Sequence, residues 1–138
     1  MEHRVWIKGG GVLIYNPARP GMKKTKRLTP WWLIVSVDKE IGKYYRSWIE
    51  RALYLKTQRP AWETHITLLN DCDVVDPQYQ QHWKKYHNQW VEFEYSVAVE
   101  QHWKFFVLPV RCQQFEEIRQ ELGIFNHHPF HITIGRME

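Results

Sequence analysis

The chain has 138 residues, a length that fits one domain with its own hydrophobic core. Its 43% hydrophobic and 25% charged residues are typical of a globular protein, and there is no apolar run of about 18 residues to predict a membrane span. The first residues, Met1–Arg4, lack the apolar region of a signal peptide. The two cysteines, Cys72 and Cys112, lack metal-ligand or redox spacing, so we expect a reduced cytoplasmic protein with inert thiols.

The N-terminal part predicts two short strands over 4–8 and 11–15, joined by a turn at the three glycines Gly9–Gly11. A loop over 17–30 follows and carries five cations without an acid: Arg19, Lys23, Lys24, Lys26 and Arg27. This loop is either a solvated surface segment or a basic flap that attracts a polyanion such as a nucleotide phosphate, and the sequence leaves its closure over a ligand open.

Two segments share one order of predicted elements, strand, helix and then strand. In the first segment, 31–69, a strand over 31–37 precedes the helix N-cap Asp38, an amphipathic helix over 41–53 and a strand over 64–69. Between the segments we expect a loop, a short helix and an alternating strand, and the second segment then repeats the order. The ranges are 70–77, 78–90 and 91–99 for the intervening elements, 100–102 for a turn, 103–110 for a strand, 113–122 for a helix that ends at Gly123, 126–129 for a loop and 130–135 for the last strand.

The repeated order predicts an internal duplication within one domain, 1–138, with pseudo-repeats at about 31–69 and 103–135. We therefore expect an α+β fold of two β-sheet lobes related by a pseudo-twofold around a concave cleft, with the helices on the outside. The last strands of the two segments would then lie side by side.

Each of these two strands contains the tripeptide His-Ile-Thr. Side chains alternate along a strand, so His65 and Thr67 share one face, and His131 and Thr133 do the same in the second copy. A single such tripeptide would indicate only a structural histidine, but two copies on predicted strands indicate a catalytic pair. One neutral and one protonated imidazole suit general acid–base catalysis, and the two hydroxyls can donate hydrogen bonds to phosphate oxygens.

Two other uses of these residues stay open. His127 and His128 precede the second motif, so a metal site at this end of the chain is an alternative, although it would need further carboxylate or thiolate ligands. No Ser or Cys beside a base indicates a nucleophilic triad. We expect neither a metal nor a cofactor, and we interpret His127 and His128 as loop residues near the ligand.

The motifs His65-Ile66-Thr67 and His131-Ile132-Thr133, with their apolar flanks, resemble the 2H phosphoesterase superfamily, which carries two His-x-Thr/Ser motifs on paired strands. The resemblance covers most of 31–135. It implies metal-independent cleavage of phosphoesters that have a ribose hydroxyl nearby.

A narrower resemblance is to the phage anti-CBASS nucleases of that superfamily. It is carried by the strand from Trp31 with the Asp38–Tyr45 segment behind it, by Arg59–Trp62, by Val91–Tyr95 and by Ile118–Gly123. It implies a nuclease that cleaves the 3′,5′ bonds of cyclic di- and trinucleotide messengers of bacterial immunity, in the host cytoplasm if the chain is phage-encoded.

The candidate substrate-binding residues are aromatic side chains that could stack on bases and cations of the basic loop: Tyr15, Trp31, Trp62, Lys24 and Lys26. Two alternatives to the cyclic substrate stay open. One is a 2′,3′-cyclic phosphodiesterase or a 2′,5′-oligonucleotide or RNA-end processing enzyme, and the other is a non-catalytic sponge that only binds nucleotides. The sequence does not distinguish the acid from the base, and base preference and oligomeric state stay open.

Overall fold

The computed structural model describes residues 4–17, 31–59, 64–70, 73–125 and 128–137. Within these residues the elements, in chain order, are β1 (Trp6–Tyr15), β2 (Leu33–Val37), α1 (Lys39–Leu53), β3 (Thr57–Gln58), β4 (His65–Leu69), the 3₁₀ helix η2 (Pro77–His82), β5 (Trp90–Ser96), β6 (Glu100–His102), β7 (Phe105–Arg111), α2 (Gln113–Glu121) and β8 (Phe130–Met137).

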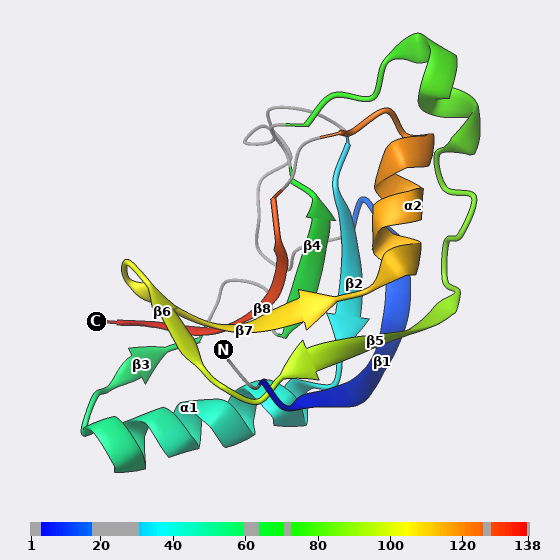
Figure 1. Cartoon of the computed structure of the whole chain (residues 1–138). Helices are drawn as coiled ribbons and strands as arrows, with labels where there is room; N and C mark the ends of the chain where they lie inside the picture. Colours follow the sequence, from blue (N-terminus) through cyan, green and yellow to red (C-terminus); the bar gives the residue numbers. More distant parts are fainter. Residues whose placement is uncertain (1–3, 18–30, 60–63, 71–72, 126–127, 138) are drawn as a thin grey trace.

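Six antiparallel strands close into one barrel in the order β1, β2, β4, β8, β7, β5, with β5 pairing back to β1 (Figure 1). β3 and β6 extend the sheet beyond β8 and β7. The expected α+β fold with two sheet lobes is therefore wrong. The strands form a single closed ring because β1 pairs with both β2 and β5, and β8 pairs with both β4 and β7.

β1 is one continuous strand, which corrects the expected turn at its three glycines. The strand passes through Gly9–Gly11, pairs with β5 along its first part and with β2 along its last part, and bends between them in Figure 1. A Cβ atom at Gly10 would collide with the ring of Trp90, and one at Gly11 would collide with the carbonyl oxygen of Ser36. The glycines therefore admit the close approach of neighbouring groups and do not reverse the chain.

The order strand, helix, strand is confirmed in the second segment, as β7–α2–β8, while in the first segment the two-residue strand β3 lies between α1 and β4. α1 begins after Asp38, whose carboxylate accepts a hydrogen bond from the backbone N–H of Glu40 at 3.0 Å, as expected of an N-cap. α2 is followed by Gly123, whose φ of 72° is the left-handed conformation that ends helices.

Two expected elements in the middle of the chain are wrong. Over 78–90 only the first residues are helical, as η2, because Lys84 and Asn88 adopt positive φ angles of 65° and 64° that interrupt a helix. The expected turn over 100–102 is the strand β6, and the chain reverses one residue later, at Trp103, with a φ of 57°.

The two faces of the barrel sheet differ in what packs against them. On one side lies the main core, in which strand residues pack with Ile49 of α1 and Phe115 and Ile118 of α2. Strand members of this main core include Leu13, Leu33, Val35, Ile66, Leu68, Phe93, Leu108, Phe130, Ile132 and Ile134. Ile66 and Ile132 are the middle residues of the two tripeptides, so the histidines and threonines of both motifs are on the other side.

Candidate functional site

The two His-x-Thr strands are direct neighbours. β4 and β8 run antiparallel, and Ile66 lies opposite Ile132. Continuing this register by one residue in each direction places His65 opposite Thr133 and Thr67 opposite His131. Each imidazole therefore lies across from the hydroxyl of the other motif, on the same face of the sheet. We call these four side chains, with the residues beside them on β2 and β7, the histidine face.

Two cross-strand rows make up the histidine face. The first row runs across four strands in the order Ser36, His65, Thr133 and Val107. The second row runs Ile34, Thr67, His131 and Pro109. The two histidines are diagonal neighbours between the rows, a relation that separates residues by about 7–8 Å in a sheet. This spacing is compatible with one phosphate group held between the two imidazoles.

The exposure of the four side chains suits contact with a ligand. His65, Thr67 and Thr133 are half-buried, and His131 is exposed. Beside them, Ile34 and Val107 are 0% and 2% exposed, although neither belongs to the main core. The polar centre of the histidine face is thus flanked on both sides by buried apolar side chains, which lower the polarity around a bound group.

His131 has a perturbed imidazole. Although the residue as a whole is exposed, neighbouring protein atoms partly desolvate its ring, and this desolvation lowers the pKa below 6.5. The nearby His102 lowers the pKa further, while a hydrogen bond with the backbone of Pro129 opposes both. The net direction is downward, so the ring is mainly neutral at pH 7. A neutral imidazole is the form that accepts a proton as a general base.

Thr64, immediately before the first motif, has an unusual backbone that its sequence context does not indicate. It is 0% exposed and has a φ of 31°, an unusual value for a β-branched residue. Its carbonyl oxygen accepts a hydrogen bond from the N–H of Val37 at 3.0 Å. Strained backbone of this kind persists where the surrounding structure holds it, and it gathers at functional sites. No pattern in the sequence distinguishes such a threonine.

Two of the expected base-stacking residues, Tyr15 and Trp31, lie in or against the main core. Tyr15 is 3% exposed and belongs to the main core, where its hydroxyl accepts a hydrogen bond from the N–H of Tyr86 and burial raises its pKa to about 12. Trp31 packs against the same core, with its ring edge-on to Trp83 at 5.0 Å. The expectation for Tyr15 is therefore corrected. Trp62, Lys24, Lys26, His127 and Cys72 lie outside the described residues.

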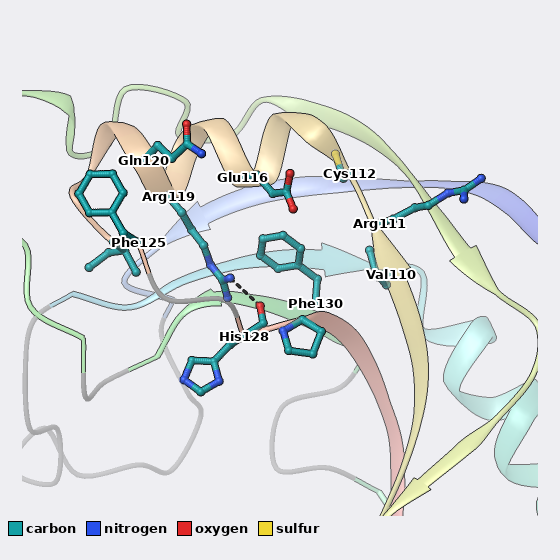
Figure 2. Close-up of a pocket in the computed structure, with 11 residues that line it drawn as sticks. Val110, Arg111, Cys112, Glu116, Arg119, Gln120, Phe125, His128 and Phe130 are labelled. Atoms are coloured by element: carbon teal, nitrogen blue, oxygen red, sulfur yellow. Dashed lines mark hydrogen bonds between the residues drawn. The ribbon is translucent and has the colours of Figure 1, made fainter.

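A cavity of about 580 Å³ lies between α2 and the start of β8, away from the four motif side chains (Figure 2). Arg119, His128 and Phe130 line it, and the guanidinium of Arg119 donates a hydrogen bond to the carbonyl oxygen of His128 at 2.7 Å. Cys112 also lines it, and burial raises the pKa of this thiol, which keeps it protonated and unreactive at pH 7.

Neither metal ligands nor a membrane helix is found in the part of the chain that the structure describes. Within it, no group of three or more His, Cys, Asp or Glu side chains is arranged to hold a metal ion. None of the helices described is both long enough and apolar enough to cross a membrane.

In comparisons with known proteins, no family model, no curated protein and no solved structure matches this chain. The functional argument therefore depends on the histidine face itself.

Proposed function

We propose that the protein is a metal-independent phosphodiesterase that cleaves ribonucleotide phosphodiester bonds at the histidine face. The observation that carries the proposal is the pairing of Ile66 with Ile132 between β4 and β8. Continuing this register brings each motif histidine opposite the threonine of the other motif. Two acid–base groups and two hydroxyl donors around one phosphate-sized space are the groups that an in-line phosphoryl transfer requires.

The reaction assigns a role to each side chain. His131, the imidazole with the lowered pKa, accepts the proton of a ribose 2′-hydroxyl as its oxygen forms a bond to the adjacent 3′-phosphorus. The bond from phosphorus to the 5′-oxygen breaks, and His65 in its protonated form donates a proton to that leaving oxygen. Thr67 and Thr133 donate hydrogen bonds to the non-bridging oxygens, where negative charge accumulates. The products are a 2′,3′-cyclic phosphate and a free 5′-hydroxyl.

For the substrate class we propose cyclic di- and trinucleotide messengers, cleaved at their 3′,5′ bonds in the bacterial cytoplasm, as the likeness to anti-CBASS nucleases implies. This activity would let a phage evade bacterial immunity. Linear 2′,5′-oligonucleotides, RNA ends and 2′,3′-cyclic phosphates are the second candidate class, because the same four side chains serve their cleavage. A sponge that only binds nucleotides is less favoured, since binding alone has no need of two acid–base groups.

The test is a panel of cyclic di- and trinucleotides, 2′,5′-oligoadenylate and 2′,3′-cyclic nucleotides, incubated with wild type and with the His65→Ala/His131→Ala variant and analysed by mass. We expect linear products from the cyclic messengers with wild type only, at equal rates with and without EDTA. Cleavage of the 2′,5′ or 2′,3′ substrates alone would establish the second class. Bound but intact cyclic nucleotide would establish the sponge, and loss of activity in EDTA would establish a metal enzyme.

The lowered pKa of His131 predicts an unusual pH profile. A general base works in its neutral form, so kcat/KM falls on the acid side as His131 takes up a proton. Because desolvation lowers this pKa, the acid limb should have its midpoint below pH 6.5. Rates of wild type measured from pH 4.5 to 8 give the midpoint, and binding of a non-cleavable analogue over the same range is the control. A midpoint above pH 6.5 would contradict the role of His131 as the base.

A further inference from the structure

Both motif strands carry a β-bulge at the residue that follows the motif threonine. Between β2 and β4, the consecutive residues Leu33 and Ile34 pair with Leu69 and Thr67, so Leu68 is the extra residue. Between β7 and β8, Phe106 and Val107 pair with Gly135 and Thr133, so Ile134 is the extra residue. A bulge interrupts the ladder of hydrogen bonds, bends the strand and redirects the side chains beside it.

The carbonyl oxygen of each bulged residue accepts a hydrogen bond from a buried arginine. Arg119 of α2 is 8% exposed, and its Nε donates to the carbonyl oxygen of Leu68 at 2.8 Å. Arg46 of α1 is 7% exposed, and one of its terminal nitrogens donates to the carbonyl oxygen of Ile134 at 3.0 Å. In both motifs, therefore, the carbonyl oxygen of the residue that follows the threonine accepts a hydrogen bond from a buried arginine.

Each arginine reaches the motif strand that its own helix does not lead into. α1 precedes β4 in the chain, but Arg46 bonds to β8, and α2 precedes β8, but Arg119 bonds to β4. Arg119 also donates a hydrogen bond to the carbonyl oxygen of His128 (Figure 2). In addition, its guanidinium lies over the ring of Phe130, 4.0 Å from the ring centroid. It therefore joins β4 to the segment that leads into β8.

Because they are buried, the hydrogen bonds of Arg46 and Arg119 are strong, and losing either one would be destabilising. A guanidinium carries a positive charge, and hydrogen bonds from a charged donor are stronger than neutral ones. A bulge carbonyl left without a donor in this buried region would lose its hydrogen bond and its hydration together. The two arginines therefore hold the backbone directly beside Thr67 and Thr133 in one geometry.

We propose that Arg46 and Arg119 are paired positioning residues, each of which fixes one bulge and thereby aims one His-x-Thr pair at the shared phosphate. The inference builds on the proposed function, and it concerns the geometry of the histidine face, which can be measured without substrate. Neither arginine is assigned a contact with the ligand.

The test compares Arg46→Met and Arg119→Met with Arg51→Met, a control on α1 at an exposed arginine that bonds to its own helix through Ser47. The imidazole signals of His65 and His131 are followed by ¹H–¹⁵N NMR in each variant without substrate. We expect Arg119→Met to shift the signals and the titration of His65 most and, through its lost contacts with His128 and Phe130, those of His131 to a smaller extent. Arg46→Met should shift those of His131 and leave His65 in place, and Arg51→Met should shift neither.

Kinetics give the second measurement. Each methionine variant should lose about 10–100-fold in kcat with KM little changed, because misplacement of groups by about 1 Å has effects of this size. Arg46→Lys should restore part of the loss, since an ammonium can still donate to one carbonyl oxygen. Arg119→Lys should restore less, since Arg119 serves the carbonyl oxygens of both Leu68 and His128. If a methionine variant does not fold, the lysine variant at that position is used in both measurements.

Several outcomes would overturn the inference. Unchanged imidazole signals in both the methionine and lysine variants would do so, as would equal shifts of both rings in every variant, which would indicate general loosening. Failure of the proposed function has a separate signature. In that case the wild-type protein would cleave none of the phosphodiesters, while the strand-specific NMR shifts would persist.

Discussion

His65→Ala and His131→Ala are each expected to reduce cleavage of a cyclic dinucleotide by about 10²–10⁴-fold, the usual contribution of a general acid or base. Without His131 no base accepts the proton of the 2′-hydroxyl, and without His65 no acid protonates the leaving 5′-oxygen. Both side chains lie on the histidine face and outside the main core, so their loss creates no core cavity. We therefore expect the free energy of unfolding to change by no more than about 1 kcal/mol.

Single-turnover rates, circular dichroism and thermal unfolding together check this expectation. His82→Ala is the matched control, since His82 is also partly exposed but lies at the end of η2 beside Glu121. Full activity in either motif variant would rule out the acid–base scheme. An inactive variant that has also lost its cooperative unfolding transition would show that the residue serves the fold, and the scheme would then lose its support.

A substrate with 2′-deoxyribose at the scissile position is expected to bind and to resist cleavage. In the proposed reaction the nucleophile is the 2′-hydroxyl, which is held beside the phosphorus by the substrate itself. Intramolecular nucleophiles reach effective molarities of about 10⁵–10⁸ M, so its removal should lower the rate on the order of 10³-fold or more. The deoxy analogue should act as a competitive inhibitor, because the phosphate contacts of Thr67 and Thr133 do not depend on that hydroxyl.

The comparison uses one cyclic dinucleotide with all-ribose, mixed and all-deoxy sugars, and the products are analysed by mass. In the mixed substrate only the linkage that follows the ribose should be cut, which makes the intact linkage an internal control. Cleavage of the all-deoxy compound at a comparable rate would show that water attacks the phosphorus. The roles of His65 and His131 would then need to be assigned anew.

Much of the local structure followed from the sequence. The capping carboxylate of Asp38, the apolar spacing of α1 and the glycine after α2 act within a few residues, and each lies where its pattern predicts. The two His-x-Thr strands were predicted for the same reason, because alternation along a strand is a local property that separates Ile66 and Ile132 from their polar neighbours. The candidate catalytic residues could thus be identified without the structure.

Some expectations failed where a local pattern had two readings. Three consecutive glycines are compatible with a turn, and also with a strand that other groups approach closely, and only the positions of Trp90 and Ser36 decide between them. Similarly, an aromatic residue such as Tyr15 suits a ligand platform or a core equally well, and its hydrogen bond with Tyr86, 71 residues away, places it in the core.

By itself, the sequence determined which residues are candidates for catalysis, which strands hold them and which face of each strand they occupy, since these properties depend on chemical identity and on the short period of the backbone. Only the tertiary structure decided that six strands close into one barrel, that Thr67 lies across from His131, and that Arg46 and Arg119 each bond to a bulge on the strand of the other segment. These features depend on contacts between residues that are distant in the chain. Such contacts form only when the whole core packs, and no local pattern encodes them.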